Sequence, residues 1–303
     1  MMTISSLTPK ASNTVAQGTA LGWRHRPDAN SPERAKRSGH IVAPFQGYHV
    51  PISRIPRALP WALVLNAGGV AMWWGTLCVA IVLLAGRGVL AADNRLTDAE
   101  KRDGWILLFD GHSLDGWITS SQQPSRRPVE DHAINPHKCG GYMMIHQKPW
   151  GDFVLALDFK ISPHCNSGVF LRTWPLEPRP GKDVGFNGIE VAIEDTTTAG
   201  YHDTGAIYDL VPPETNAMKP AGQWNHMQVT CDKNLISVEL NGTPVSKLDL
   251  DQWTVKNKRP DGSDHKFDIA FKDHPRSGYL GVQDHGGDCW FKNIKLKPVT
   301  EKK

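Results

Sequence analysis

The chain has 303 residues, of which 40% are hydrophobic and 21% charged, the balance of a globular protein. Its 28 glycines, 22 prolines and 11 tryptophans indicate many turns and aromatic-rich strands, and exclude a simple helical bundle. Residues 1–60 carry eight basic and two acidic side chains, so the other 243 residues have a net charge of −3. The main body therefore lacks the basic footprint of a nucleic-acid-binding protein, and we expect no nucleic-acid partner.

The N-terminal part divides into a basic tail and an apolar run. Residues 1–60 are rich in Ser, Pro, Arg and Gly without periodicity, which predicts a disordered tail or an over-extended gene model with the true start at Met72. Residues 61–92 hold most of an uncharged run, which predicts one apolar helix serving as a signal peptide or a signal anchor. Small residues at the −3 and −1 positions suit cleavage after Ala91, and we favour the cleaved signal. Either alternative predicts that the rest of the chain is extracytoplasmic (periplasmic, secreted or anchored on the outer side), with membrane contact only through this segment.

Four cysteines follow the apolar run: Cys139, Cys165, Cys231 and Cys289. An even number in an exported protein permits disulfides, and the absence of a CxxC pair argues against structural zinc. Cys139 and Cys165 flank one strand region and are the better candidates for a bridge. Cys231 and Cys289 are equally well explained as buried thiols.

The mature part, residues 93–303, is expected to form one β-rich domain. Thr97 and Glu100 have the spacing of a capping box and begin a short helix. Beyond it, alternation of apolar and polar residues predicts strands at 105–109, 153–160, 168–172, 188–194, 227–231, 236–240 and 278–283. Asn241-Gly242 lies between two extended segments and predicts a tight hairpin, because both residues tolerate positive φ. This pattern indicates an all-β fold, an antiparallel β-sandwich of jelly-roll type.

Strand alternation also sorts the polar residues. If Ile189, Val191 and Ile193 face the core, Glu190 and Glu194 share the opposite face. The same reasoning predicts that Gln283 and His285 point outward, as do Asn166 and Arg172, each from its own strand. A carboxylate, an imidazole and a guanidinium on one face would suit acid–base chemistry with stabilisation of an oxyanion. The competing interpretation is an ordinary solvated sheet face.

Lys292 is a different case. It has the same strand parity as Trp290, Ile294 and Leu296, which predicts a lysine on an apolar face. Such a lysine extends its amine to solvent, pairs with a carboxylate or serves a site.

A series of short motifs resembles the 3-keto-disaccharide hydrolase family, also described as a 3-keto-glucoside 1,2-lyase/3-keto-2-hydroxyglucal hydratase domain. The motifs occur in the family's order: GWILLFDG at 104–111, LDGW at 114–117, GDF at 151–153, NSGVFLR at 166–172, GIEV at 188–191, TGAIY at 204–208, PAGQWN at 220–225, LNG at 240–242, QDHG at 283–286 and WFKNI at 290–294. The resemblance covers about residues 104 to 298. It implies a concanavalin-like jelly-roll β-sandwich and an exported enzyme that acts on oxidised sugars.

The chemistry that this resemblance implies begins with a ketone at C3, which acidifies the proton on C2. A base removes that proton, the C1–oxygen bond breaks by elimination, and water then adds to the enone, so that the net result is hydrolysis. Glu190 and His285 match motif positions and are the acid/base candidates, while Asn166, Arg172, Gln283 and Lys292 are candidates for binding the substrate. No cofactor is firmly implied, although a divalent metal ion at the C3 oxygen would suit the reaction.

Two positions depart from the family pattern: Ala192 stands where we expect glutamine, and Lys292 where we expect arginine. Two alternatives to the lyase/hydrolase therefore stay open. One is a non-catalytic carbohydrate-binding module, since a fold does not fix a function. The other is a conventional glycosidase that uses Glu190 and Glu194.

Overall fold

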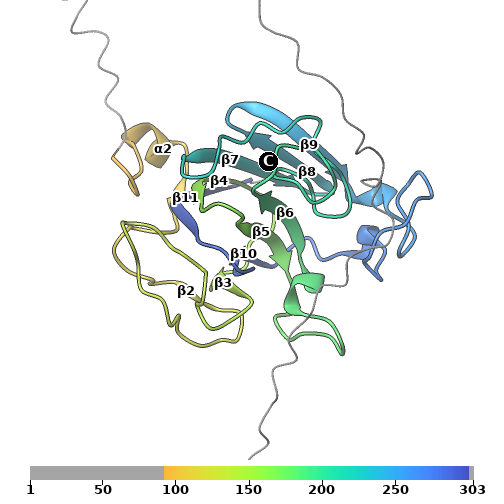
Figure 1. The fold of residues 1–303 in the computed structure, drawn as a ribbon, viewed down its shortest axis with the longest axis horizontal. Coiled ribbons are helices and arrows are strands. Elements are labelled where there is room, and N and C mark those ends of the chain that lie inside the picture. The colour runs from red at the N-terminus through yellow and green to blue at the C-terminus, as the bar shows by residue number, and fades with distance from the viewer. Residues whose placement is uncertain (1–91, 300–303) are drawn as a thin grey trace, which may run out of the picture. The chain divides into compact units, whose positions relative to one another are not determined.

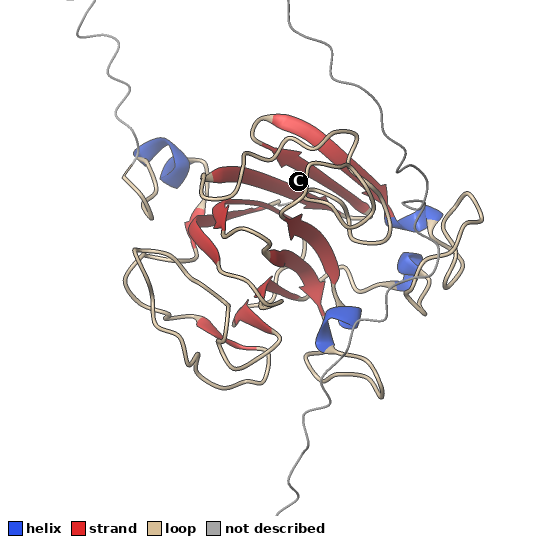
Figure 2. Cartoon of the chain, in the orientation of Figure 1, coloured by secondary structure: helices blue, strands red, loops and turns tan. Residues whose placement is uncertain are grey.

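The computed structural model describes residues 92–299, which form two antiparallel β-sheets (Figure 1). Strands account for most of the regular structure, and the helical segments are short (Figure 2). The six-stranded sheet has the order β1 (Ile106–Leu107), β11 (Cys289–Pro298), β4 (Phe153–Ile161), β7 (Asn225–Asp232), β8 (Leu235–Leu240) and β9 (Thr243–Asp249). The five-stranded sheet has the order β2 (Trp117–Thr119), β3 (Met143–His146), β10 (Tyr279–Gln283), β5 (Asn166–Thr173) and β6 (Ile189–Glu194). The predicted all-β sandwich is confirmed.

The helical segments lie outside these sheets: α2 (Asp98–Arg102), η1 (Val184–Asn187), η2 (Leu250–Gln252) and η3 (Phe271–Asp273). Within residues 92–299, no helix is long and apolar enough to cross a membrane. The predicted tail at 1–60 and all but the last residue of the predicted signal or anchor segment at 61–92 lie outside the described residues.

The core lies between the two sheets and follows the alternation read from the sequence. Phe153, Leu155, Leu157 and Phe159 of β4 are all at most 2% exposed and meet the inward side chains of the five-stranded sheet. Burying such side chains is the main stabilisation available to a sandwich, at roughly 1.5–3 kcal/mol for each. A smaller apolar cluster, which includes Met143, Ile145 and Phe170, covers part of the outer face of the five-stranded sheet.

Two local predictions from the sequence, the capping box and the tight hairpin, are also confirmed. Thr97 and Glu100 form the reciprocal capping box at the start of α2. Asn241 and Gly242 connect β8 to β9 with φ values of +52° and +82°, as a tight hairpin requires.

The expected Cys139–Cys165 bridge is wrong, because all four described cysteines are buried free thiols. The Cys139 thiol donates to the Gly141 carbonyl at 3.5 Å and so stays within its own turn. Cys165 instead lies beside Cys289, and burial together with that neighbouring thiol raises the pKa of Cys289.

The start of the domain is fastened to its last strand. Asn94 and Asn293 exchange hydrogen bonds, with the Asn94 amide donating to Asn293 Oδ1 at 2.5 Å and the Asn293 amide donating to Asn94 Oδ1 at 2.8 Å. Three lysines of β11 then pair with acidic residues near α2: Lys292 with Asp93, Lys295 with Glu100 and Lys297 with Asp103. We call this set of contacts the terminal clasp.

Candidate active site

The outer face of the five-stranded sheet carries the candidate site, because strand register aligns its residues in rows. Phe170 of β5 lies opposite Gly281 of β10 and opposite Glu190 of β6. Tyr208 extends this row, since its amide donates to the Glu190 carbonyl at 2.9 Å. The next row contains Gln283, Gly168, Ala192 and Ala206, about 7 Å further along the strands. Three of these four residues have little or no side chain, so the second row forms a low floor beside Glu190.

The Glu190 carboxyl lies over that floor. A Cβ atom at Gly168 would stand 2.5 Å from Glu190 Oε1, so only glycine leaves room for this carboxyl group. Burial raises the pKa of Glu190 to about 8; Asp183 and Glu194 push it in the same direction, while Lys266 opposes the shift. The group therefore exchanges its proton near neutral pH, as a general acid or base must.

Gln283 and Tyr142 form a polar pair beside the carboxyl. Gln283 is 3% exposed and its Nε2 donates to Tyr142 Oη at 2.8 Å, which leaves the tyrosine proton free for another acceptor. The Gln283 Oε1 atom is buried without a hydrogen-bond partner. Burial and the charge of Glu190 raise the pKa of Tyr142, so its hydroxyl stays protonated. The pair thus offers a donor and an unsatisfied acceptor to a bound hydroxylated molecule.

Lys266 supplies positive charge to the same region. Its Nζ lies 4.1 Å from the centroid of the Tyr208 ring. Although the side chain is exposed as a whole, packing of the amine against aromatic rings lowers the pKa of Lys266, and the negative charge of Glu190 opposes that shift. Burial raises the pKa of Tyr208 to about 12, so its hydroxyl also remains a donor at neutral pH.

Among the residues expected from the sequence, Asn166, Glu190 and Gln283 share the outer face of the five-stranded sheet, and Gln283 lies in the row next to Glu190. Asn166 lies opposite Glu194, one row beyond the row that contains Gly168 and Gln283. His285 is exposed, follows the end of β10 by two residues, and makes no hydrogen bond or ion pair with another described residue. Continuing the β10–β5 register by three positions beyond the Val282–Val169 pair would set His285 opposite Asn166, at the end of the same face.

Arg172 does not share this face, so its expected placement is wrong. A bulge between Tyr279 and Gly281 in the β10–β5 register, with Arg172 at φ +50°, breaks the alternation after Phe170. The guanidinium is fully buried and points elsewhere, donating to Asp152 Oδ1 at 2.8 Å and to the Gly151 and Lys233 carbonyls. Arg172 connects the two sheets instead of facing a ligand beside Glu190.

The expected apolar face for Lys292 is wrong, whereas the alternative that it pairs with a carboxylate is confirmed. The register of β11 against β4 shifts between Lys292 and Lys295, and Asn293 adopts φ +53°, so Ile294 and Leu296 face the core whereas Lys292 does not. The Lys292 amine pairs with Asp93 at 2.6 Å and lies 4.3 Å from the centroid of the Trp224 ring. Because β11 belongs to the six-stranded sheet, Lys292 does not join the site around Glu190.

Three residues of the site were not predicted from the sequence: Tyr142, Tyr208 and Lys266. Tyr208 ends the TGAIY motif, whose pairing along the edge of β6 could have been suspected from its alternation. Tyr142 precedes its strand, and Lys266 lies in a turn-rich segment, so no periodicity marks either residue.

Metal ligands and a second carboxylate were the remaining expectations for this face. Among residues 92–299, no group of three or more His, Cys, Asp or Glu side chains could hold a metal ion. Glu194 is four residues from Glu190 on β6, which separates their Cα atoms by about 13 Å. A glycosidase pair needs carboxyl groups within about 5–9.5 Å, so these two side chains would have to converge from distant positions.

The outer face of this antiparallel β-sandwich thus holds a half-buried titratable carboxyl above a row of small residues, with hydroxyl, amide and ammonium groups around it. Such a site suits a polar, hydroxylated molecule. Residues 104–297 match the model of the 3-keto-alpha-glucoside-1,2-lyase-like domain, and the chain belongs to that family.

Individual relatives agree with this assignment. The chain is 26% identical over 227 residues to a 3-keto-disaccharide hydrolase from Bacteroides thetaiotaomicron, which covers 64% of this chain and 78% of that protein. Two crystal structures from Parabacteroides distasonis ATCC 8503 that carry the provisional description glycosyl hydrolase are also similar. One is 27% identical with a TM-score of 0.56 and covers 69% of this chain and 100% of its own. The other is 28% identical with a TM-score of 0.53 and covers 64% and 99% respectively.

Proposed function

We propose that the domain of residues 93–303 cleaves 3-keto-glycosides by elimination followed by hydration, with Glu190 as the group that exchanges the C2 proton. The observation that carries this proposal is the Glu190 carboxyl, whose pKa is raised to about 8 by burial above Gly168. An ionised carboxylate of that pKa is a far stronger base than an ordinary one, and it is still populated at neutral pH. The family membership supplies the substrate class, a sugar oxidised at C3.

In the first half of the proposed reaction, the Glu190 carboxylate takes the proton from C2. The C2 electron pair moves into an enolate, with negative charge on the C3 oxygen. The hydroxyl of Tyr142 and the ammonium of Lys266 are the nearby groups that can stabilise that charge. The enolate then reforms the ketone as the C1–oxygen bond breaks, which leaves a double bond between C1 and C2, and the departing oxygen takes a proton from an acid.

In the second half, water adds across this double bond. Its oxygen joins C1 and gives one proton to the group that protonated the departing oxygen, while the proton held by Glu190 returns to C2. Both groups are thereby restored, and the sum of the two halves is hydrolysis. His285 is our proposed donor to the departing oxygen, supported by its position beyond Gln283 at the Asn166 end of the face. Asn166 and Gln283 are proposed to bind sugar hydroxyls, the latter through its unsatisfied Oε1 atom.

The test is release of reducing sugar from a 3-keto-disaccharide by the purified protein. Glu190→Gln keeps the size of the side chain but removes the base, so it should abolish turnover. Glu194→Gln is the matched control, since it removes a carboxylate from the same face of the same strand. Full activity in Glu190→Gln would end the assignment of Glu190.

The same assay separates the alternatives. Binding of unoxidised glycans without any turnover would favour a carbohydrate-binding module. Cleavage of an ordinary glycoside, lost equally in both variants, would favour a two-carboxylate glycosidase.

We also propose that the protein is exported, supported by the apolar run before residue 92 and by the small residues Val89 and Ala91 at the −3 and −1 positions. The full chain expressed in a bacterial host should be recovered outside the cytoplasm. N-terminal sequencing distinguishes a cleaved signal, which begins the mature chain at Ala92, from a retained anchor. Recovery of the uncleaved chain in the cytosol would contradict export.

A further inference from the structure

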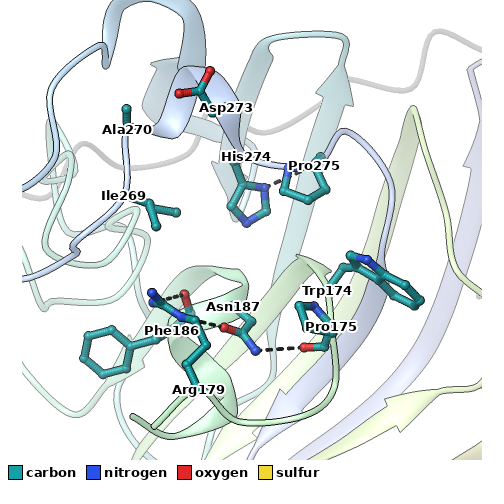
Figure 3. A pocket seen from close by; sticks show the side chains of 10 residues that line it. All are labelled: Trp174, Pro175, Arg179, Phe186, Asn187, Ile269, Ala270, Asp273, His274 and Pro275. Atoms are coloured by element: carbon teal, nitrogen blue, oxygen red, sulfur yellow. Dashed lines mark hydrogen bonds between the residues drawn. The ribbon is translucent and has the colours of Figure 1, made fainter. Parts of the chain in front are cut away.

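A cavity lies near the candidate site, between the segment that follows β5 and the segment around η3 (Figure 3). Its volume is about 340 Å³, and its wall includes apolar groups from Pro175, Phe186 and Ile269. Ligand pockets usually measure about 300–1,000 Å³, so this one has room for a single small ring. The candidate catalytic residues do not line it, which leaves its use unexplained by the proposed reaction.

His274 points into this cavity with an unmet hydrogen-bonding need. Figure 3 shows its imidazole directed from the η3 side into the space above Asn187. The residue is 4% exposed, and its Nε2 has no hydrogen-bond partner. The nearby Asn187 backbone raises the pKa of His274, but the opposite effect of burial is larger. A buried polar atom without a partner costs free energy, so an occupant that satisfies it gains affinity.

The protonation state of His274 tells what that occupant must offer. Its Nδ1 lies 2.9 Å from the Pro275 carbonyl, which can only accept, so the proton of the neutral ring is on Nδ1. Burial lowers the pKa of His274 to about 4, and the ring is therefore neutral at neutral pH. Nε2 is consequently a hydrogen-bond acceptor, and it requires a donor from the ligand.

The other polar groups of the cavity point to the same kind of ligand. The side-chain amide of Asn187 donates to the Pro175 and Glu177 carbonyls. Arg179 donates through Nε to Asn187 Oδ1 and through Nη2 to Asp268 and the Phe186 carbonyl, while its Nη1 makes no hydrogen bond with a described residue. The exposed Asp273 carboxylate forms no side-chain hydrogen bond within the described part of the chain. The cavity thus offers acceptors from His274 and Asp273 and a donor from Arg179, and a ligand rich in hydroxyl groups can satisfy both kinds.

Trp174 provides the apolar platform. It is 53% exposed, an unusual degree for tryptophan, and its ring is stacked against Tyr279 at a centroid distance of 6.0 Å. The residue lines this cavity and also a neighbouring one of about 760 Å³. A rigid aromatic ring held at a rim is suited to pack against the C–H face of a sugar whose hydroxyls point the other way.

The cavity is also near the carboxyl site. Asn187 precedes Glu190 by three residues, so their Cα atoms are at most about 11 Å apart. Phe186 lines the cavity and lies 5.1 Å, from ring centroid to Nζ, from the Lys266 amine that faces Glu190. Two linked sugar rings could span this separation.

We propose that the cavity bounded by Trp174 and His274 is a second sugar-binding subsite, which takes an unoxidised pyranose ring. The ring packs on Trp174 and one of its hydroxyls donates to His274 Nε2. Binding there does not depend on the chemistry at Glu190. That this ring is the non-oxidised half of the substrate does rest on the proposed function.

The experiment uses methyl α-D-glucopyranoside, which has no ketone and so is not a substrate of the proposed reaction, with the full-length protein and titration calorimetry. We expect saturable binding that Trp174→Ala weakens roughly tenfold and His274→Phe weakens about threefold to tenfold. Trp290→Ala, which removes a tryptophan from the six-stranded sheet, is the matched control and should bind as the wild type does. Circular dichroism checks that each variant is folded.

Deoxy derivatives of the glucoside test the hydrogen bond itself. The derivative that loses most affinity for the wild type should lose none for His274→Phe, because the bond is already absent there. Equal losses in both proteins would overturn the role of His274. Absence of saturable binding, or binding that survives Trp174→Ala but is lost in Glu190→Gln, would overturn the subsite. Binding through Trp174 by a protein that does not cleave 3-keto-disaccharides would remove the proposed function and leave the subsite standing.

Discussion

Replacing Gly168 by alanine tests whether the position of the Glu190 carboxyl matters for catalysis. The new Cβ would stand 2.5 Å from Glu190 Oε1, 2.8 Å from its Cγ and 3.0 Å from its Cδ. Ordinary contact begins near 3.4 Å, so the carboxyl must move by roughly 0.9 Å. The main chain need not move, because the contacting atoms belong to the flexible end of a side chain.

The expected effect follows from that displacement. A misplacement of about 1 Å at a reacting group costs on the order of 100-fold in rate, so kcat of Gly168→Ala should fall by about that factor. Stability should change little, because alanine is intrinsically favoured over glycine in a strand by about 0.5–1 kcal/mol, which offsets part of the crowding. The variant should therefore be folded but nearly inactive.

The assay is initial-rate release of reducing sugar from a 3-keto-disaccharide, with thermal unfolding measured in parallel. Gly281→Ala is the control, because the Cβ there would meet the Met143 sulfur at 2.4 Å and not Glu190. The double variant of Gly168→Ala with Glu190→Gln should be no slower than Glu190→Gln alone. A folded Gly168→Ala protein with activity within twofold of wild type would refute the reasoning.

Four further outcomes are expected. kcat should rise with pH through about 8, where Glu190 ionises, and a profile unchanged in Glu190→Gln would contradict its role. Because the folded-state pKa of Glu190 lies above the ordinary value of 4.5, its contribution to stability is full below pH 4.5 and is lost as pH rises through 8. The Tm of Glu190→Gln minus the Tm of wild type should therefore be larger at pH 9 than at pH 5. Arg172→Met should lower the free energy of unfolding by about 3–5 kcal/mol in urea titrations, since it leaves Asp152 without its buried partner, and an unchanged midpoint would contradict this. Lys292→Ala should lower it by at most about 1 kcal/mol and leave kcat and KM unchanged; a large rise in KM would return Lys292 to the site.

Much of the fold could be predicted because strand alternation is a local property. The inward positions of β4 and β6, the hairpin at Asn241-Gly242 and the capping box at Thr97 all follow from neighbouring residues. The outward direction of Glu190 was predictable for the same reason, and its motif position drew attention to it. Gln283 was found in the same way.

The errors arose where alternation is interrupted. Arg172 and Asn293 each adopt positive φ at a bulge, and neither residue is a glycine that would have signalled a break. One extra residue reverses every later side chain, which is why Arg172 and Lys292 were assigned to the wrong surroundings. The groups around Glu190 from Tyr142 and Lys266 come from outside regular strands, so only the folded chain reveals them.

The terminal clasp has a consequence for the order in which the domain is completed. Asp93 and Lys292 are 199 residues apart, and ribosomes add roughly 5–20 residues per second, so the two partners are synthesised about 10–40 s apart. β11 also separates β1 from β4 in the six-stranded sheet, so that sheet stays open until the final strand is synthesised. The N-terminal end of the domain is thus made first and secured last, so the six-stranded sheet of the nascent chain closes only at the end of synthesis.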